Sequence, residues 1–240
     1  MAVFQKQFDI CYSHLDEKRR VKVTALLDFL QDVATAHSDS LGLTLENMRR
    51  DGAFWVLVSF DITLHALPQI DARITVETWS SGIKTIYGYR NFRMLAENGA
   101  VLLEAVSVWV YMGWETMRPL RVPPEKAALF APQTPAVLPR KLSLPQPSCT
   151  APALTYQVMR RDIDTNLHMN NVKYLELALE TLPQSLWKRT PTHLQLQFLH
   201  AATYGEQLHI FLDSSGDSAL CCIRPQAAAE PASLVRITYE

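Results

Sequence analysis

The sequence predicts an α+β protein made of two copies of one unit, in which a strand and a long helix precede an antiparallel sheet. Two observations support this. Helical periodicity followed by strand periodicity occurs twice along the 240 residues. The two stretches also match at steady offsets: Asp16 corresponds to Asp164, 148 residues later, and the run ITVETWSSG from Ile74 corresponds to LHIFLDSSG from Leu208, 134 residues later. Chance similarity between two α+β halves is the alternative.

In the first half, apolar residues alternate over Phe4–Tyr12, which indicates a strand. After a polar loop they recur at helical spacing as far as Leu41, and Thr24 is the expected N-cap of this helix. A second, short helix is expected at Leu45–Asp51, capped by Thr44 and ended by Gly52. The later strands of this half are expected at Phe54–His65, Ala72–Ser80, Thr85–Leu95 and Val101–Met112, with turns at Gly82 and Asn98-Gly99.

The same order returns after a proline-rich segment, Pro119 to Pro152, which holds nine of the 14 prolines and predicts an extended linker. We therefore expect domains at 1–130 and 153–240, with the linker at 131–152. The second half should contain a strand at Leu154–Arg160, a loop at Arg161–Asn170, a helix at Asn171–Thr181, and strands at Thr192–Leu199, Gln207–Leu212, Ala219–Arg224 and Ser233–Tyr239.

Composition excludes several classes of protein. A net charge of −1 does not favour nucleic acid or an anionic membrane as partner. No apolar run approaches the roughly 20 residues that span a bilayer, and the first ten residues lack a secretory signal pattern. The four cysteines have neither disulfide-framework nor zinc-site spacing, so we expect reduced thiols and a cytoplasmic protein.

Polar side chains that could take part in catalysis are concentrated just before the second long helix. Asp164, Asn166 and His168 are spaced by two residues, so a locally extended loop would project an acid, an amide and an imidazole to one side. Asn170 or Asn171 can then cap the helix, whose N-terminus suits a developing oxyanion. The first half shares only Asp16 with this group, which indicates that one copy is equipped for chemistry.

Other interpretations of the cluster are weaker but remain open. Asp and Asn before a helix often serve only as caps and turn formers. A metal site lacks a second His or Cys at ligand spacing. No G-x-S-x-G element supports a serine nucleophile, and no glycine-rich phosphate loop supports a nucleotide. We therefore expect neither a cofactor nor a metal.

The segment Asp162–Tyr174, DIDTNLHMNNVKY, resembles the D-x-D-x-N-x-H-x-N-N-x-x-Y signature of the acyl-[acyl carrier protein] (acyl-ACP) thioesterases of bacteria and plant plastids. Further segments resemble that family: LLDFLQD from Leu26, FWV from Phe54, VETWSSGIK from Val76, and Trp109 to Arg121. The resemblance implies a double hot-dog fold and cofactor-free hydrolysis of fatty acyl-ACP. It also implies an acyl tunnel in the N-terminal copy, and catalysis by Asp164, Asn166 and His168 in the C-terminal copy.

One departure from the family concerns the strand after the catalytic helix. Many members carry a Glu there, followed in plant enzymes by a Cys, but these positions fall on Ala201 and Ala202. His200 is displaced by one residue and would face the other way. Asp164 is therefore expected to act as general base toward water or as a nucleophile, with His168 and Asn166 assisting.

The expected partner is an acyl carrier protein with a fatty acyl chain on its phosphopantetheine arm. Carrier proteins are acidic, so Arg160 and Arg161 beside the site are the best contact candidates, ahead of Lys173, Lys188 and Arg189. Three rivals remain: an acyl-CoA thioesterase on this fold, a non-catalytic acyl-binding relative, and a double hot-dog dehydratase, which the N-x-H-x-N-N pattern disfavours. The sequence leaves chain-length preference and homodimer formation open.

Overall fold

The computed structural model describes residues 3–130 and 142–239. The chain divides into two compact units, which we call unit 1 (Met1–Val58 and Ile62–Arg140) and unit 2 (Ser59–Asp61 and Lys141–Glu240). Of the linker expected at 131–152, residues 131–141 lie outside the described residues. The remainder, 142–152, contains no helix or strand.

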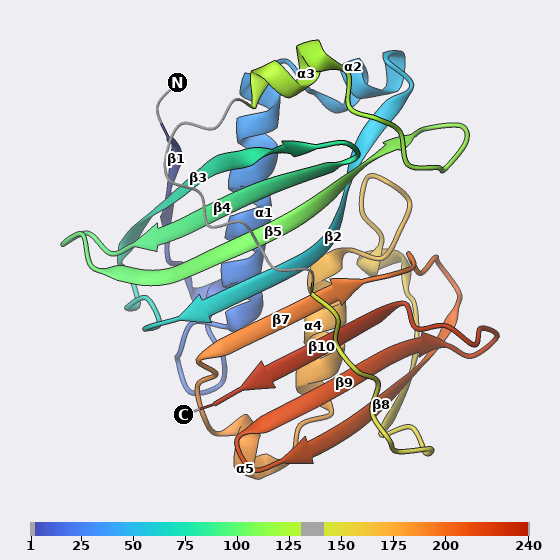
Figure 1. The fold of residues 1–240 in the computed structure, drawn as a ribbon. Coiled ribbons are helices and arrows are strands. Elements are labelled where there is room, and N and C mark those ends of the chain that lie inside the picture. Colours follow the sequence, from blue (N-terminus) through green and yellow to red (C-terminus); the bar gives the residue numbers. More distant parts are fainter. Residues whose placement is uncertain (1–2, 131–141, 240) are drawn as a thin grey trace. The chain divides into compact units, whose positions relative to one another are not determined.

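In unit 1 the long helix α1 (Val23–Ser40) packs against a sheet with the strand order β1-β3-β4-β5-β2 (Figure 1). The strands are β1 (Phe4–Asp9), β2 (Ala53–Leu64), β3 (Arg73–Lys84), β4 (Tyr87–Leu95) and β5 (Val101–Gly113). Three short helices accompany them: η1 (Tyr12–His14), α2 (Leu45–Arg50) and α3 (Pro124–Leu129). The core of unit 1 includes the buried residues Leu27, Leu30 and Val33 of α1 and Val76 and Met94 of the sheet.

Unit 2 repeats this plan with the helix α4 (Asn171–Glu180) and a sheet with the strand order β7-β10-β9-β8-β6 (Figure 1). Its strands are β6 (Leu154–Gln157), β7 (His193–Phe198), β8 (Gln207–Ser215), β9 (Ser218–Pro225) and β10 (Ser233–Thr238), and they pair antiparallel. Two short helices are η2 (Arg160–Asp162) and α5 (Gln184–Trp187). Leu175 and Ala178 of α4, together with Leu196 and Val235 of the sheet, have no exposed surface.

The repeat extends to the turn that precedes each long helix. In unit 1 a bridge between Leu15 and Val21 closes this turn; in unit 2 the bridge joins Ile163 and Met169, each 148 residues later. At the same offset, Arg19 and Leu167 adopt left-handed backbone angles, with φ of 60° and 64°. Such angles are uncommon outside glycine, so their recurrence at matching positions supports the predicted duplication over chance similarity.

The structure corrects the expected start of the first helix. Helix α1 begins at Val23, its N-cap is Lys22, and Thr24 is buried inside the first turn. The Lys22 N–H donates to the carbonyl of His14 at 2.9 Å, so the closed turn sets where the helix begins. The other predicted cap is confirmed: the Thr44 hydroxyl accepts from the backbone N–H of Asn47 at 3.3 Å and caps α2.

Two further expectations were wrong, and one helix was not predicted. Gly82 does not end the strand, because β3 continues to Lys84 through a bulge between Ser80 and Gly82, where the glycine has a φ of 123°. The proline-rich segment is not wholly extended, since Pro124 opens the helix α3, where its fixed φ suits the first turn. The short helix α5, which follows Pro183 directly, was not predicted from the sequence.

Candidate active site

Asp164 lies in a tight turn just before helix α4. Its Oδ1 accepts a hydrogen bond from the backbone N–H of Asn166 at 2.8 Å and a longer one from that of His168 at 3.4 Å. The Asp164 N–H donates to the carbonyl of His168 at 2.8 Å and closes the turn. Within the described residues, Oδ2 of Asp164 has no hydrogen-bond or ion-pair partner. One carboxylate oxygen therefore shapes the loop, and the other is available.

The corresponding carboxylate of unit 1 is fully engaged. Oδ1 of Asp16 accepts from the backbone N–H groups of Lys18 (2.9 Å) and Arg20 (2.8 Å), as in unit 2. Its Oδ2, however, accepts from Nε (3.0 Å) and Nη2 (2.9 Å) of Arg20. Burial raises the pKa of Asp16, but the hydrogen bonds from Arg20 and Lys18 outweigh burial and lower it. Because His168 stands where unit 1 has Arg20, Asp164 alone of this pair keeps an oxygen that no described residue contacts by a hydrogen bond or ion pair.

The segment from Asp164 to His168 is not extended, contrary to expectation. Leu167 has a left-handed φ of 64°, so the backbone reverses direction there. The Asp164 carboxylate accepts hydrogen bonds from two backbone N–H groups of this turn. Asn166 is exposed and His168 is half-buried. In the part of the chain that the structure describes, no hydrogen bond joins the side chains of these three residues to one another. The structure brings them together through the backbone of one turn.

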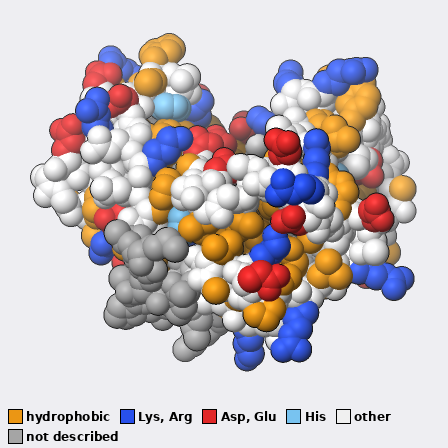
Figure 2. Space-filling view, turned by 90° about the horizontal axis from the view of Figure 1, so that it is seen from above, with side chains coloured by type: hydrophobic (Ala, Val, Ile, Leu, Met, Phe, Trp, Pro, Cys, Tyr) orange, Lys and Arg blue, Asp and Glu red, His pale blue; other side chains and the backbone are white. Residues whose placement is uncertain are grey.

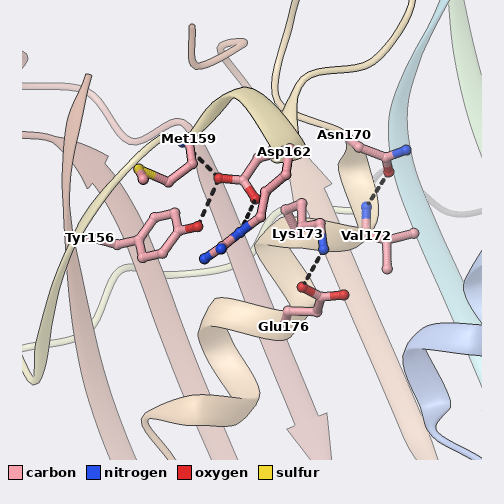
Figure 3. Close-up of polar contacts among 8 residues, drawn as sticks. Tyr156, Met159, Asp162, Asn170, Val172, Lys173 and Glu176 are labelled. Carbon is pink, nitrogen blue, oxygen red and sulfur yellow. Dashed lines mark hydrogen bonds and ion pairs between the residues drawn. The ribbon is translucent and has the colours of Figure 1, made fainter. Parts of the chain in front are cut away.

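At the start of α4, Asn170 is the cap and Asn171 is the first helical residue. The side-chain Oδ1 of Asn170 accepts from the N–H of Val172 at 2.9 Å (Figure 3). The backbone N–H groups of Met169, Asn170 and Lys173 are already bonded, to carbonyls of Ala202, Asp162 and Asn170. Among the described residues the side-chain Nδ2 of Asn170 has no partner, so this amide is an open donor at the start of α4.

Asp162, the other acid of the cluster, has a structural role. It is 2% exposed, and its Oδ2 accepts from the hydroxyl of Tyr156 and from the N–H of Met159, both at 2.7 Å (Figure 3). The equivalent position in unit 1 is His14, whose Nδ1 accepts from the N–H of Cys11 at 3.0 Å. Both side chains hold the short helical turn that precedes the site.

The loop between β7 and β8 is attached to the helix start by Ala202 and Tyr174. The N–H of Ala202 donates to the Tyr174 hydroxyl at 2.9 Å, and the carbonyl of Ala202 accepts from the N–H of Met169 at 2.8 Å. Burial first, and then the negative charges of Glu206 and Asp164, raise the pKa of Tyr174 to about 12. Tyr174 is the last position of the signature motif, but residue spacing did not predict its contact with this loop.

Ala201 and Ala202 occupy different environments in that loop. Ala201 is exposed and Ala202 is completely buried. Neither side chain can donate or accept a proton, so these two positions contribute only backbone groups.

Exposed apolar and basic side chains surround the same turn. The guanidinium of Arg160 lies 4.9 Å from the ring centroid of Tyr204, which is 57% exposed. Leu167, at the tip of the turn, is 76% exposed. Arg161 is also exposed, and its Nε lies 3.9 Å from Asp162 Oδ1. On the face drawn in Figure 2, basic side chains are interspersed with acidic ones, so basic groups on that face do not form one broad patch.

Within residues 3–130 and 142–239, no group of three or more His, Cys, Asp or Glu side chains could hold a metal ion. No helix there is long and apolar enough to cross a bilayer. All four cysteines are free thiols.

Comparison with protein-family models gives two matches along the chain. Residues 1–130 match the acyl-ACP thioesterase N-terminal domain, and residues 148–231 match the C-terminal domain of the same family. The chain belongs to the acyl-ACP thioesterase family. Within this family, Asp164, Asn166 and His168 lie in the part of the chain that matches the C-terminal domain.

Curated relatives in this family are distant. The chain is 28% identical over 202 residues to dodecanoyl-[acyl-carrier-protein] hydrolase of Cinnamomum camphora. This alignment covers 78% of this chain and 52% of the relative. It is 26% identical over 207 residues to oleoyl-acyl carrier protein thioesterase 1 of Arabidopsis thaliana, covering 76% and 56%. The chain thus spans about half the length of the curated relatives it matches.

Solved structures confirm the double hot-dog fold. An acyl-ACP thioesterase from Bacteroides thetaiotaomicron superposes with a TM-score of 0.90 at 22% identity, covering 99% of this chain and 98% of that one. A putative oleoyl thioesterase from Lactobacillus plantarum gives 0.85 at 27% identity, covering 100% and 96%. The 12:0-ACP thioesterase from Umbellularia californica gives 0.84 at 21% identity, covering 99% and 97%.

Proposed function

We propose that this protein hydrolyses the thioester of a fatty acyl-ACP and releases a free fatty acid and holo-ACP. The observation that supports this most directly is the free Oδ2 of Asp164, which its counterpart Asp16 lacks because Arg20 occupies it. Membership of the acyl-ACP thioesterase family gives the reaction class. No cofactor is required, since water is the second substrate.

In the first form of the mechanism, Asp164 is the general base. Its Oδ2 takes a proton from a water molecule, the water oxygen attacks the thioester carbonyl, and the carbon–sulfur bond breaks. In the second form, Oδ2 attacks the carbonyl itself and gives a transient anhydride that water then hydrolyses. In both, His168 orients the water or the carboxylate and assists departure of the thiolate, and Asn166 orients the substrate or the water.

The oxyanion that develops on the carbonyl oxygen needs a hydrogen-bond donor. We propose the start of α4 for this role, where Asn170 and Asn171 lie at the positive end of the helix dipole. Because the neighbouring backbone N–H groups of Met169, Val172 and Lys173 are already bonded, the side-chain Nδ2 of Asn170 is the donor we favour.

We further propose that the acidic carrier protein contacts Arg160 and Arg161. Both side chains are exposed beside the turn that carries Asp164, and Leu167 and Tyr204 add apolar surface there. Acidic and basic surfaces that complement each other raise association rates.

We also propose that the two units have different roles: unit 1 (expected domain 1–130) holds the acyl chain, and unit 2 (expected domain 153–240) performs the chemistry. A cytoplasmic location stays a prediction.

The decisive experiment replaces Asp164 by Asn and measures free fatty acids released from a mixed acyl-ACP pool. Loss of a general base should reduce kcat by roughly 2–4 orders of magnitude. Near-normal hydrolysis by Asp164→Asn would show that the assignment is wrong. Parallel assays with acyl-CoA decide between the two thioesters, and acyl binding without turnover by the wild type would favour the non-catalytic alternative. The same pool reports chain-length preference.

A further inference from the structure

A row of buried polar side chains crosses the face of the unit 1 sheet that packs against α1. Ser80, Arg90 and Ser107 lie directly opposite one another on β3, β4 and β5, and all three are at most 9% exposed. Arg90 reaches His37 of α1, so this row faces the helix. The next row along the same strands, Thr78, Phe92 and Ala105, is also buried but carries no charge.

Arg90 has only uncharged partners. Its Nη1 donates to Nδ1 of His37 at 2.8 Å and to the Thr78 hydroxyl at 3.1 Å, and its guanidinium carbon lies 5.9 Å from the ring centroid of Phe130. No acidic side chain pairs with it among the described residues. Burial lowers the pKa of Arg90 only to about 10, so it stays cationic at neutral pH. Burial, and then the Arg90 charge, lower the pKa of His37 to about 4, so His37 is a neutral acceptor.

The other edge of this guanidinium carries two donors that no described residue engages. Nε and Nη2 of Arg90 have no hydrogen-bond partner among the described residues. These two nitrogens form the parallel pair of donors that matches the two oxygens of a carboxylate. In residues 3–130 and 142–239, the one fully enclosed side-chain nitrogen or oxygen without a partner is Nε1 of Trp79, so the free Arg90 nitrogens border accessible space.

Comparison with unit 2 shows that the fold does not require this charge. The matching row of unit 2 consists of Ser214, Ala219 and Ile237 on β8, β9 and β10. Ser214 follows Ser80 at the offset of 134 residues, and Ala219 takes the place of Arg90. A buried cation without a counter-charge costs folding free energy. Its presence in one copy alone therefore indicates a role other than folding.

We propose that Arg90 anchors a ligand site in unit 1 that binds the carboxylate of a fatty acid. The positive charge of Arg90 favours an anionic group on the ligand, and the aromatic side chains near His37 favour an apolar chain attached to it. Phe4 stacks on His37 with ring centroids 5.2 Å apart, and the Phe130 ring lies 6.3 Å from His37 and 6.1 Å from Trp55. A carboxylate on the Nε–Nη2 edge would neutralise the guanidinium, and the chain would lie among these rings.

A fatty acid is also the product of the proposed reaction, but the site makes a separate claim. Its test measures binding without turnover, so hydrolysis can fail while binding holds, or the reverse. The substitution Arg90→Met removes the charge and keeps the length of the side chain. The matched control is Arg93→Met on the same strand, because Arg93 points to the opposite face, pairs with Glu77 at 2.7 Å, and is 41% exposed in its side chain.

The experiment is isothermal titration of each variant with dodecanoate and with 1-dodecanol, both below micelle-forming concentrations. In the wild type and in Arg93→Met, dodecanoate should bind about tenfold or more tightly than the alcohol, as expected for a charge-assisted bidentate contact. In Arg90→Met this preference should vanish. Equal affinities for acid and alcohol in the wild type, or a preference that survives in Arg90→Met, would overturn the proposal; the second result would place the carboxylate elsewhere, such as near Asp164.

Thermal unfolding provides a second measurement if titration of a variant is limited by its stability. Dodecanoate should raise the Tm of the wild type and of Arg93→Met, and leave that of Arg90→Met unchanged. Without ligand, Arg90→Met should melt no lower than the wild type, because it removes an uncompensated buried charge. A large fall in its Tm would contradict the proposal, since it would mean that the charge serves folding.

Discussion

At the scale of single residues, the two halves differ in what occupies the second oxygen of one aspartate. Asp16 and Asp164 form the same turn through Oδ1, and in both the backbone N–H groups two and four residues later donate to it. Arg20 then binds Oδ2 of Asp16 with two nitrogens, whereas His168 leaves Oδ2 of Asp164 open within the described residues. In the proposed mechanism, the carboxylate that only shapes a turn in unit 1 is the reactive one in unit 2, because a single neighbour differs.

The residues that would receive the carrier protein can be tested by reversing their charge. The double substitution Arg160→Glu and Arg161→Glu should raise KM for acyl-ACP about tenfold, since like charges now face the acidic carrier. KM for acyl-CoA should change less. Arg50→Glu, at an exposed arginine of unit 1, is the control and should leave both values near those of the wild type. An equal rise in KM for the two substrates would show that these arginines do not recognise the carrier protein.

At the scale of elements, the start of α4 combines capping with the proposed chemistry. Asn170 uses Oδ1 to cap the helix and leaves Nδ2 for an oxyanion. Asn170→Asp keeps a capping oxygen but loses the donor, and Asn170→Ala loses both. We expect Asn170→Ala to lower the free energy of unfolding by about 1 kcal/mol. Asn170→Asp should retain stability but lose 10²–10³ in kcat, the range for removing one oxyanion donor.

Chemical denaturation and steady-state assays on both variants separate the two roles. If Asn170→Asp keeps full activity, the side-chain amide is not the donor. If Asn170→Ala keeps full stability, the cap contributes little to the folded protein.

The packing of α1 on the unit 1 sheet predicts a pH dependence of stability. His37 has a folded-state pKa of about 4, below its ordinary 6.5, because burial and Arg90 disfavour its charged form. The unfolded chain therefore takes up a proton first as pH falls, and stability is lost between about pH 6.5 and 4. The loss from His37 is at most about 3 kcal/mol, from the shift at 1.36 kcal/mol per pKa unit.

Urea unfolding at pH 7 and pH 5 measures this loss. His37→Gln keeps an acceptor for Arg90 but does not titrate, so its stability should fall less than that of the wild type over this range. Parallel pH dependence in the two proteins would show that His37 does not contribute.

At the scale of the whole molecule, we propose that the two copies of one fold carry different chemistry. The paired substitutions Asp16→Asn and Asp164→Asn test this difference directly. Asp16→Asn should retain hydrolysis and lower the free energy of unfolding by about 1–3 kcal/mol, because charge-assisted bonds to Arg20 are lost. Asp164→Asn should show the opposite result, with little change in stability and a large loss of kcat. Activity assays and denaturation of both proteins measure the pair, and loss of activity in Asp16→Asn would refute the division.

Much of the fold followed from local pattern. The alternating run at Phe4 and the helical spacing from Leu26 predicted β1 and α1, and the hydroxyl of Thr44 predicted the cap of α2. These features depend on residues close together in the chain. Thr24 and Gly82 misled the prediction because tertiary contacts decided both positions: the closed turn at Lys22 started the helix earlier, and a bulge extended β3.

By itself, the sequence determined that the chain is duplicated, that one copy holds Asp164, Asn166 and His168 before a helix, and which family it resembles, because spacing and residue type are local properties. Only the tertiary structure decided which oxygen of Asp164 lacks a partner among the described residues, that Asp162 is structural, and that none of those residues gives the buried Arg90 a counter-charge. Each of these depends on partners brought together by chain reversal or strand pairing. Such partners cannot be read from spacing, because hydrogen bonds and burial are set in three dimensions.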